Sequence, residues 1–510
     1  AVAAVLRRRA PDMAVSLSSE VQPEFREYER LSTTVLNAYL QPVMGAYLHT
    51  LEDGVIEKAG NASLGINQSS GGLMSPARAR ELPVRTALSG PAAGAVGAAY
   101  VARQVGRRNV ITLDMGGTSA DAALIRDFKV DLAFDRDVAG FPIRLPCVDV
   151  ETVGAGGGSV AWFDRDGLMK VGPISAGADP GPACYGRGGE RPTVTDANLL
   201  LGRLSSRGLL DGDMGLDPGA ARRAFGSLTK ELGFTAERTA HGVLGIVVAN
   251  MVRTIRTISV ERGHDPRDFV LMPFGGAGPL HARDVATSLG IREMIIPVAP
   301  GIVCAQGLLV SDLKEDFVAS RRLDLNADGR DVLATVLGDL NVRAAEWFEL
   351  EKAPDEARHL RLAIDARYVG QNFELTVPVT DGRHIGVGDI PDAERLHAQF
   401  CAVHETAYGY ASPDDPVEIV NIRLSASARL HKDGEQAKPS GEAPPPVARD
   451  HRSVFFEAEV AVNTPTFARA DLKPGQKIAG PAIIEQLDTT TPVYPGDLAE
   501  VTPDGHIVIT

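Results

Sequence analysis

The stretch from Val110 to Ile125, Val-Ile-Thr-Leu-Asp-Met-Gly-Gly-Thr-Ser-Ala-Asp-Ala-Ala-Leu-Ile, constrains the fold of this chain more than any other. Its two apolar runs predict two strands joined by a tight turn. Gly116 and Gly117 lack a Cβ, so the backbone of the turn can approach a phosphate closely. The turn amides, helped by the hydroxyls of Thr118 and Ser119, can cradle anionic oxygens. An ordinary hairpin turn also favours Asp and Gly, so a purely structural role remains open.

Two carboxylates, Asp114 and Asp121, stand on either side of this turn. Carboxylate oxygens suit a hydrated Mg²⁺, and an acid in this position can orient an attacking water. We therefore predict that Asp114 and Asp121 are catalytic and that Asp114 is the metal ligand.

A second glycine-rich turn occurs far downstream. A short predicted strand over 268–273 leads into Gly275, Gly276 and Gly278, and the next helix begins near Pro279. A strand, a glycine turn and a helix N-terminus together form a site suited to nucleotide contact.

A third glycine-rich loop contains Gly156, Gly157, Gly158 and Ser159. No clean strand–loop–helix unit surrounds it, so a Rossmann interpretation is weak. Either the loop lines a cleft near the substrate or nucleotide, or its glycines are structural turns.

Other residues carry a weaker functional signal. Cys184 could be a nucleophile, but no histidine lies within ten residues to activate it, which favours a packing role. Isolated histidines are more often structural than metal-binding, and isolated arginines form surface ion pairs as often as they bind anions. The remaining candidates of these kinds are His264, Asp265, His281, Arg144, Arg187 and Arg191.

Composition excludes several classes of protein. The formal net charge of −14 over 510 residues argues against a nucleic-acid partner. No run approaches 18 consecutive apolar residues, so no membrane span is predicted. The four cysteines form no CxxC pair, and a reducing cytoplasm is the simplest compartment.

The chain resembles a known family in several segments that occur in the family's order. Asp114–Asp121 is similar to the second phosphate loop of actin-like ATPases, and Phe274–Ala282 to their adenosine loop. Further segments resemble the A subunit of the hydantoinase/5-oxoprolinase family: Glu29–Leu40, Ser89–Gly94, Gly177–Gly189 and Pro300–Leu308.

This resemblance implies an α/β fold with an actin-like ATPase (ribonuclease H-like) core and a C-terminal β-rich domain. It implies an ATP- and Mg²⁺-dependent subunit that opens a small cyclic amide such as a hydantoin or 5-oxoproline. The family pattern also implies a hydantoinase B-type partner subunit and an oligomer. An ATP-dependent ketone carboxylase subunit and a non-catalytic scaffold are the alternatives.

Family members resembling this chain carry a further N-terminal region with a first phosphate loop of the form Asp-x-Gly-Gly-Thr-x-x-Asp. Only one such loop occurs here, at Asp114. We therefore expect half of the phosphate cradle to be missing from these residues.

The order of predicted elements suggests five segments: a remnant of an N-terminal domain over 1–45, the ATPase core over 46–325, an α+β region over 326–430, a proline-rich linker over 431–452 and a small β-rich unit over 453–510. The principal predicted helices cover residues from about 32, then 43–59, 92–105, 241–262 and 331–358, and short strands are predicted over 13–17, 363–368 and 373–378.

Overall fold

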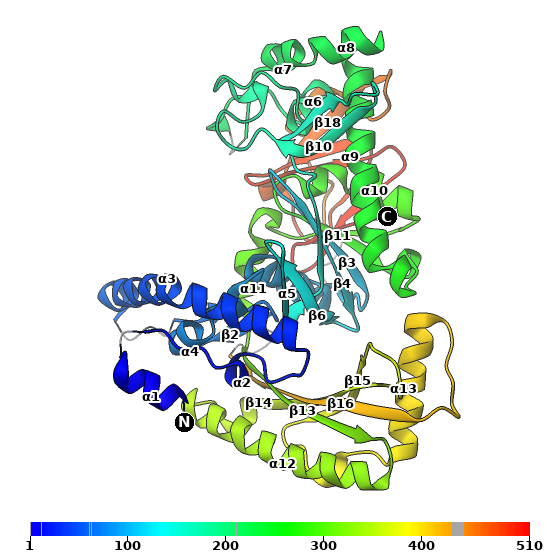
Figure 1. Ribbon diagram of the computed structural model, residues 1–510. Coiled ribbons are helices and arrows are strands. Elements are labelled where there is room, and N and C mark those ends of the chain that lie inside the picture. The colour runs from blue at the N-terminus through cyan, green and yellow to red at the C-terminus, as the bar shows by residue number, and fades with distance from the viewer. Residues whose placement is uncertain (1, 12, 61, 63, 210–211, 431–442) are drawn as a thin grey trace. The chain divides into compact units, whose positions relative to one another are not determined.

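The computed structural model describes residues 2–11, 13–60, 62, 64–209, 212–430 and 443–510 (Figure 1). The chain divides into two compact units, each built from separated segments. Unit 1 takes residues 1–93, 132–148 and 308–433, and unit 2 takes 94–131, 149–307 and 434–510. The boundaries expected from the sequence, which describe contiguous segments, remain predictions.

Unit 2 is built on a nine-stranded mixed sheet with the order β19-β22-β23-β12-β11-β3-β4-β5 and with β8 beside β4. Its central strands β3, β11 and β12 are parallel, and the remaining pairs are antiparallel. The strands are β3 (Val110–Met115), β4 (Ala120–Arg126), β5 (Lys129–Val130), β8 (Val150–Val153), β11 (Val270–Phe274), β12 (Met294–Ile296), β19 (Lys477–Ala479), β22 (Leu498–Val501) and β23 (Ile507–Ile509).

Helices bury apolar side chains against this sheet. The longest in unit 2, α9 (Ala236–Ile258), begins at Thr235, whose side chain accepts a hydrogen bond from the backbone N–H of Arg238. The sequence predicted this helix over 241–262; it ends earlier, and a 3₁₀ turn leads to Gly263. Three further helices pack against this sheet: α5 (Ser89–Val105), α10 (Gly278–Leu289) and α11 (Val303–Val310). Three short helices pack beside α9 or beside one another: α6 (Val194–Leu200), α7 (Pro218–Ala224) and α8 (Gly226–Leu232).

The segment Ala236–Arg262, which contains α9, is long and apolar enough to cross a membrane by length and composition. Half of its most apolar window is buried inside the protein, and its apolar residues belong to the main core of unit 2. Packing in the core of unit 2 therefore explains why this helix is so apolar.

The C-terminal segment is rich in strands, and three of them belong to the central sheet of unit 2. Strand β23 pairs with β12, so β19, β22 and β23 complete one side of the central sheet of unit 2. Its other strands form a second, four-stranded sheet: β17 (Asp450–Phe455), β18 (Ala461–Ala468), β20 (Ala482–Glu485) and β21 (Thr490–Val493). Two hairpins complete the strands: β6 (Leu132–Val138) with β7 (Phe141–Val148), in unit 1, and β9 (Ser159–Phe163) with β10 (Met169–Ser175), in unit 2.

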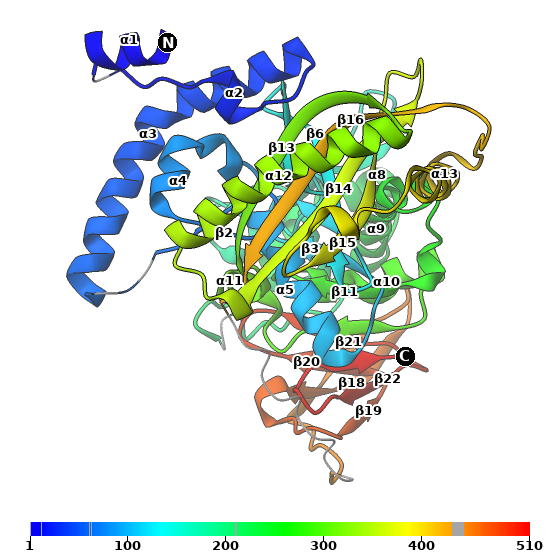
Figure 2. The same ribbon diagram turned by 90° about the horizontal axis from the view of Figure 1, so that it is seen from below.

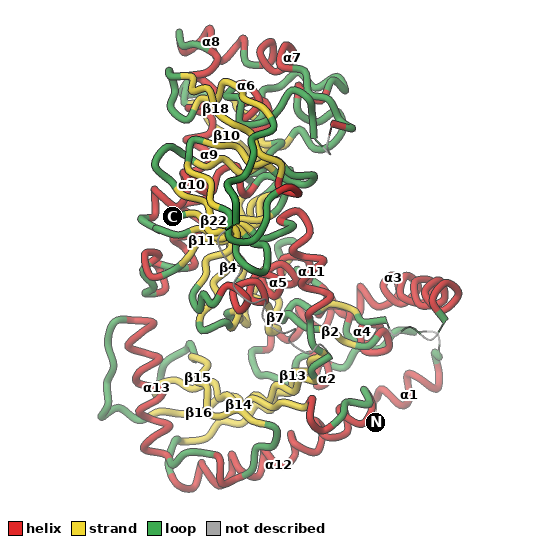
Figure 3. The backbone as a smooth tube through the Cα atoms, turned by 180° about the vertical axis from the view of Figure 1, so that it is seen from behind, coloured by secondary structure: helices red, strands yellow, loops and turns green. Residues whose placement is uncertain are grey.

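Unit 1 contains a six-stranded sheet of order β1-β2-β13-β16-β14-β15. Helix α12 (Ala327–Leu350) runs along it (Figures 2 and 3), whereas α13 (Ala393–Tyr408) packs beside β15 and is seen nearly end-on in Figure 2. Both helices contribute side chains to the apolar core of this sheet. The strands are β1 (Ile66–Asn67), β2 (Leu73–Met74), β13 (Leu313–Asp324), β14 (Arg358–Tyr368), β15 (Leu375–Gly382) and β16 (Val417–Ala428).

The other face of this sheet is polar, because successive side chains of a strand alternate between its faces. Asp365 on β14 and Arg423 on β16 lie on that face and form a buried ion pair. Glu24 pairs with Arg423 at 2.8 Å and with Arg144 of β7 at 2.7 Å. Arg144 also pairs with Glu374. Because these buried charges are paired with one another, the segments that carry Glu24 and Arg144 can pack on the polar face of the sheet.

One continuous helix, α3 (Glu27–Ala59), replaces the two helices expected from about residue 32 and over 43–59. Pro42 lies inside it and removes one backbone donor without ending the helix. Exposed apolar residues follow α3 at intervals of three and four, which places them along one stripe: Tyr28, Leu31, Val35, Tyr39, Val43 and Tyr47.

Three other expectations need correction or completion. Residues 13–17 form no strand, and the helix expected over 331–358 is α12, which is followed after Pro354 by β14. In the expected linker, residues 431–442 lie outside the described residues, 443–449 are loop, and β17 begins at Asp450.

Candidate nucleotide site

The candidate site begins at the turn that joins β3 to β4. Asp114 and Asp121 are directly paired across this antiparallel hairpin. Gly116, Gly117 and Thr118 are exposed, and both glycines have open space where a Cβ would stand. The turn therefore presents an uncovered stretch of backbone next to two carboxylates.

Asp114 has the most perturbed carboxyl group of the site. Burial raises the pKa of Asp114 to about 6; a hydrogen bond from Cys304 opposes the shift and the charge of Asp121 adds to it. The Cys304 Sγ lies 3.5 Å from the Asp114 Oδ2. Burial and the charge of Asp114 raise the pKa of the Cys304 thiol to about 12, so Cys304 keeps its proton and acts as the donor. A carboxyl group whose pKa lies near neutrality can exchange a proton during a reaction.

Asp121 is also a perturbed acid. Burial raises its pKa, and a hydrogen bond from the hydroxyl of Thr152, on β8, opposes that shift. The hairpin and the neighbouring strand thus hold two partly buried carboxylates side by side.

The glycine loop after β8 lies directly against the β3–β4 turn. The backbone N–H of Gly157 donates to the Gly116 carbonyl at 2.9 Å, and that of Gly158 donates to the Gly117 carbonyl at 2.7 Å. A Cβ on Gly156 would stand 2.4 Å from the Thr118 nitrogen. The loop therefore supports the turn from one side and fixes its shape. The sequence alone did not indicate this direct contact between the two loops.

The turn after β11 approaches the same place. A Cβ on Gly275, whose φ is +76°, would stand 2.4 Å from the Asp114 Oδ1. The N–H of Ala277 donates to the Met115 carbonyl at 3.0 Å. Gly278 begins α10, and a Cβ there would lie 3.1 Å from the Leu113 carbonyl oxygen. Because β3 and β11 are parallel, the turns that follow them share one edge of the sheet.

Two C-terminal residues complete this edge. Thr489 donates its hydroxyl to the Gly276 carbonyl at 2.9 Å. Asp488 accepts the backbone N–H of Gly301 at 2.6 Å, just before α11. The turn between β20 and β21 therefore joins the loops that follow β11 and β12.

Sequence reasoning placed the three glycine loops but missed four of the residues beside them: Thr152, Cys304, Asp488 and Thr489. The sequence did contain a signal for Cys304, because this residue lies in Pro300–Leu308, one of the segments that carry the resemblance. Nothing local distinguishes the other three, which are single polar residues brought in by distant strands.

Cys184 occupies a structural position. It is fully buried, and its backbone N–H donates to the Asp196 Oδ1 at 2.7 Å. Burial and the charge of Asp196 raise the pKa of the Cys184 thiol far above its ordinary value. Since the thiolate is the nucleophilic form, the structure favours the packing role.

We therefore expect Cys184 to resist iodoacetamide at pH 8 in the folded protein and to react once the chain is unfolded in urea. Peptide mass spectrometry after each treatment measures the modified fraction. Modification of Cys184 at the same rate with and without urea would contradict its burial as a protonated thiol.

The two candidate histidines have structural surroundings. His281 is completely buried, and burial lowers its pKa to about 4, so the ring is neutral at pH 7. His264 packs edge-to-face on Phe269, and Asp265 pairs with Arg267 at 2.6 Å. Among the residues that the structure describes, no group of three or more His, Cys, Asp or Glu side chains is placed to hold a metal ion.

The three candidate arginines differ in their surroundings. Arg144 is buried in the ion network of unit 1, where its charge is matched by carboxylates. Arg187 and Arg191 are exposed in unit 2. Arg144 thus has a structural role, while the two exposed arginines stay predictions.

Comparisons with known proteins identify the family of this chain. The family model described as Hydantoinase/oxoprolinase matches residues 30–317, and that of the Hydantoinase/oxoprolinase C-terminal domain matches residues 323–509. The alpha subunit of caprolactamase from Pseudomonas jessenii is 37% identical over 99% of this chain and 73% of its own length. The 5-oxoprolinase 1 of Arabidopsis thaliana is 32% identical over 97% of this chain and 40% of its own length.

Two solved structures share the fold. The crystal structure of ATP-dependent caprolactamase from Pseudomonas jessenii has a TM-score of 0.88 and 36% identity, covering 99% of this chain and 74% of that one. The nucleotide-free structure of acetone carboxylase has a TM-score of 0.76 and 26% identity; the match covers 97% of this chain and 71% of that one. By sequence and by fold, the chain belongs to the hydantoinase/oxoprolinase family.

Proposed function

We propose that this protein is the A-type subunit of an ATP-dependent hydrolase of cyclic amides. The observation that carries the proposal is the convergence of three glycine loops around Asp114, at the edge where the parallel strands β3 and β11 end. Ligands of open α/β sheets bind at this kind of edge. The similarity to an ATP-dependent caprolactamase and to 5-oxoprolinases supports the reaction class.

We assign the nucleotide contacts to the three loops. The β3–β4 turn, with Gly116, Gly117, Thr118 and Ser119, would bind the phosphates, and the N-terminus of α10 with Gly275, Gly276 and Gly278 would face adenine or ribose. Gly156 and Gly157 would hold the phosphate turn in shape. This division of roles corresponds to an actin-like ATPase core, which we propose for unit 2.

The two carboxylates fit a magnesium ion. Mg²⁺ favours oxygen ligands, and in nucleotide sites it commonly takes one or two carboxylates, with water and phosphate oxygens completing its shell. Asp114 and Asp121 are paired across the hairpin, and the charge of Asp121 contributes to the raised pKa of Asp114. A cation would relieve that repulsion, and we propose Asp114 as its principal ligand.

A nucleotide makes chemical sense for a cyclic-amide substrate. Resonance makes an amide carbonyl a poor electrophile, and ATP would supply a phosphoryl group that turns the carbonyl oxygen into a leaving group. Before a cation binds, Asp114, with a pKa of about 6, can hold or release a proton near neutral pH. The surrounding loops would act mainly by positioning and by stabilising charge.

We propose that the subunit works in an oligomeric complex with a hydantoinase B-type partner. The related caprolactamase and acetophenone carboxylase chains are themselves named as subunits. All four cysteines are free thiols, which fits the cytoplasm as the proposed compartment. Nucleic acid is not an expected ligand, given the net charge of −14.

A ketone carboxylase is the second candidate. The gamma subunit of acetophenone carboxylase from Aromatoleum aromaticum is 30% identical over 97% of this chain, and acetone carboxylase shares the fold. A non-catalytic scaffold is the third candidate function.

One experiment separates the three candidates. The full gene product is reconstituted with its partner subunit and given Mg²⁺-ATP with caprolactam, 5-oxoproline or hydantoin, or with acetone or acetophenone and bicarbonate. Our proposal expects ADP release that depends on a cyclic amide. ADP release that depends only on a ketone and bicarbonate would favour the carboxylase. Failure to bind labelled ATP would favour the scaffold.

The open space at Gly116 supplies a sharper test of the phosphate turn. We expect Gly116→Ala to leave the melting temperature unchanged, since the added methyl group meets no atom of the chain within 4 Å. The same methyl group would stand where a phosphate approaches, so the KM for ATP should rise about tenfold, which corresponds to roughly 1.4 kcal/mol.

Gly245→Ala is the matched control, since Gly245 lies on the exposed side of α9 and also has open space. An unchanged KM in Gly116→Ala would place the phosphates away from this turn.

A further inference from the structure

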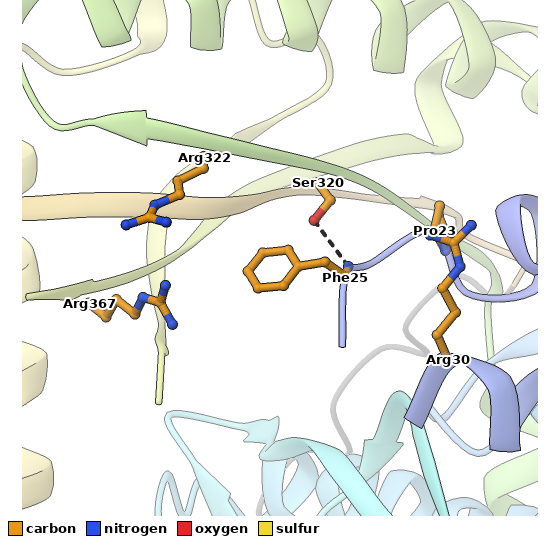
Figure 4. A pocket seen from close by; sticks show the side chains of 6 residues that line it. All are labelled: Pro23, Phe25, Arg30, Ser320, Arg322 and Arg367. Atoms are coloured by element: carbon orange, nitrogen blue, oxygen red, sulfur yellow. Dashed lines mark hydrogen bonds between the residues drawn. The ribbon is translucent and has the colours of Figure 1, made fainter. Parts of the chain in front are cut away.

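A cavity of about 460 Å³ opens on the polar face of the unit 1 sheet. Pro23, Phe25, Arg30, Ser320, Arg322 and Arg367 line it (Figure 4). All six belong to unit 1, whereas the nucleotide loops belong to unit 2. Ligand pockets in proteins commonly have volumes of roughly 300–1,000 Å³, so this cavity can hold a small molecule.

Two of the arginines are held by one carboxylate. Arg367, on β14, donates its Nε to the Glu418 Oε1 at 2.8 Å, and Arg322, on β13, donates its Nε to the Glu418 Oε2. Glu418 is almost completely buried, and hydrogen bonds from both arginines hold its pKa below the ordinary value, against the effect of burial. It therefore stays charged and holds both guanidinium groups through their Nε atoms.

Both arginines line the cavity. In Figure 4 the guanidinium groups of Arg322 and Arg367 point toward one another beside the ring of Phe25. Arg367 is largely buried, with a side chain only 12% exposed, so its charge is partly shielded from water. Two cations share one neutralising carboxylate, which leaves positive charge beside the cavity.

The nearby acids do not cancel this charge. Glu24 is occupied by Arg144 and Arg423, and Glu374 by Arg26 and Arg144. Arg30 adds a third cation at the far side of the cavity (Figure 4).

The remaining wall is apolar and fixed in place. The backbone N–H of Phe25 donates to the Ser320 hydroxyl at 3.4 Å, which ties this segment to β13. The Phe25 side chain is still 43% exposed and, with Pro23, covers one side of the cavity. The cavity thus combines a cationic end with an aromatic surface.

We propose that this cavity binds a small organic oxyanion, with a phosphate or carboxylate head on the cavity side of Arg322 and Arg367 and an apolar body against Phe25. Guanidinium groups present pairs of N–H donors in a plane that matches both kinds of head group. The site lies outside the nucleotide loops and is independent of the proposed reaction.

Isothermal titration calorimetry on the full chain with phenyl phosphate, benzoate and inorganic phosphate tests the proposal, and benzyl alcohol is the neutral control. We expect saturable binding of phenyl phosphate or benzoate and none of benzyl alcohol. Tighter binding of phenyl phosphate would identify a phosphomonoester ligand, and tighter binding of benzoate a carboxylate.

Two variants assign the binding to this cavity. Arg322→Gln should weaken it at least about tenfold, the effect expected on losing a hydrogen bond to a charged group. Its side chain is 66% exposed, so the fold should tolerate the change. Arg321→Gln is the matched control, because Arg321 is exposed and directly precedes Arg322 on β13; this variant should bind the anions as the unsubstituted protein does. Phe25→Ala should weaken phenyl phosphate and benzoate but not inorganic phosphate. The proposal is overturned if no anion binds saturably, or if Arg322→Gln binds as tightly as Arg321→Gln.

Discussion

Replacing Asp114 by Asn should lower ATP-dependent turnover by at least about 100-fold, the scale of a lost general acid–base group. The amide keeps the shape of the side chain but can neither exchange a proton near pH 6 nor attract a cation. Asp114 lies between the turns that follow β3 and β11, where a Cβ on Gly275 would nearly touch it. The measurement is steady-state ADP release by the full complex with its cyclic-amide substrate.

The same substitution should stabilise the protein above pH 6. The folded-state pKa of about 6 exceeds the ordinary value of 3.8, so the folded state holds this proton more tightly than the unfolded chain. The contribution of Asp114 to stability is therefore complete below pH 3.8 and is lost as the pH rises through 6. Asn cannot ionise, and the stability gain of Asp114→Asn over the unsubstituted protein should grow between pH 5.0 and 7.5 in urea unfolding.

Asp166→Asn is the matched control, because Asp166 is an exposed acid of unit 2 in the turn between β9 and β10. It should leave turnover unchanged. Turnover of Asp114→Asn within twofold of the unsubstituted complex would dismiss Asp114 as a catalytic or metal-binding group. A stability difference that does not change with pH would show that its pKa is not raised.

Adding one methyl group at Gly156 should also impair the enzyme, though less than Asp114→Asn does. In Gly156→Ala the new Cβ would stand 2.4 Å from the Thr118 nitrogen and 2.5 Å from the Gly117 carbonyl carbon. Backbone atoms cannot rotate away, so the phosphate turn must shift. Overpacking of this kind typically costs about 1–3 kcal/mol of stability, and we expect kcat/KM for ATP to fall at least about tenfold.

Two comparisons separate a displaced turn from general damage. Gly245→Ala adds the same methyl group on the exposed side of α9; it should raise stability by about 0.5–1 kcal/mol, because Ala favours a helix over Gly, and leave kcat/KM unchanged. The loss in Gly156→Ala should appear in kcat/KM at a temperature well below unfolding, with an unchanged circular dichroism spectrum. Normal kinetics in a folded Gly156→Ala would show that the loop of residues 154–158 does not shape the nucleotide site.

Local patterns in the sequence were sufficient for the elements that carry the glycine loops. Alternating and continuous apolar runs predict β3, β4 and β11, and Gly-Gly between two strands predicts the turn. Apolar residues that recur at intervals of three and four positions predict α9. The resemblance to the family rests on short motifs of this kind, and the comparisons confirm the family. The errors concern elements whose ends depend on neighbours: α3 runs through Pro42, and residues 13–17 form no strand.

The sequence by itself thus determined which chemical groups are present and which short segments hold them. Only the tertiary structure decided their partners. Cys304 meets Asp114 from 190 positions away, and Thr489 meets Gly276 from 213 positions away. Strand β23 completes the sheet that contains β3, and Glu24 neutralises Arg144, which the sequence offered as an anion-binding residue. The physical reason is that periodicity and turn chemistry act over a few residues, whereas burial, ion pairing and a shifted pKa depend on which distant segments exclude water from a group.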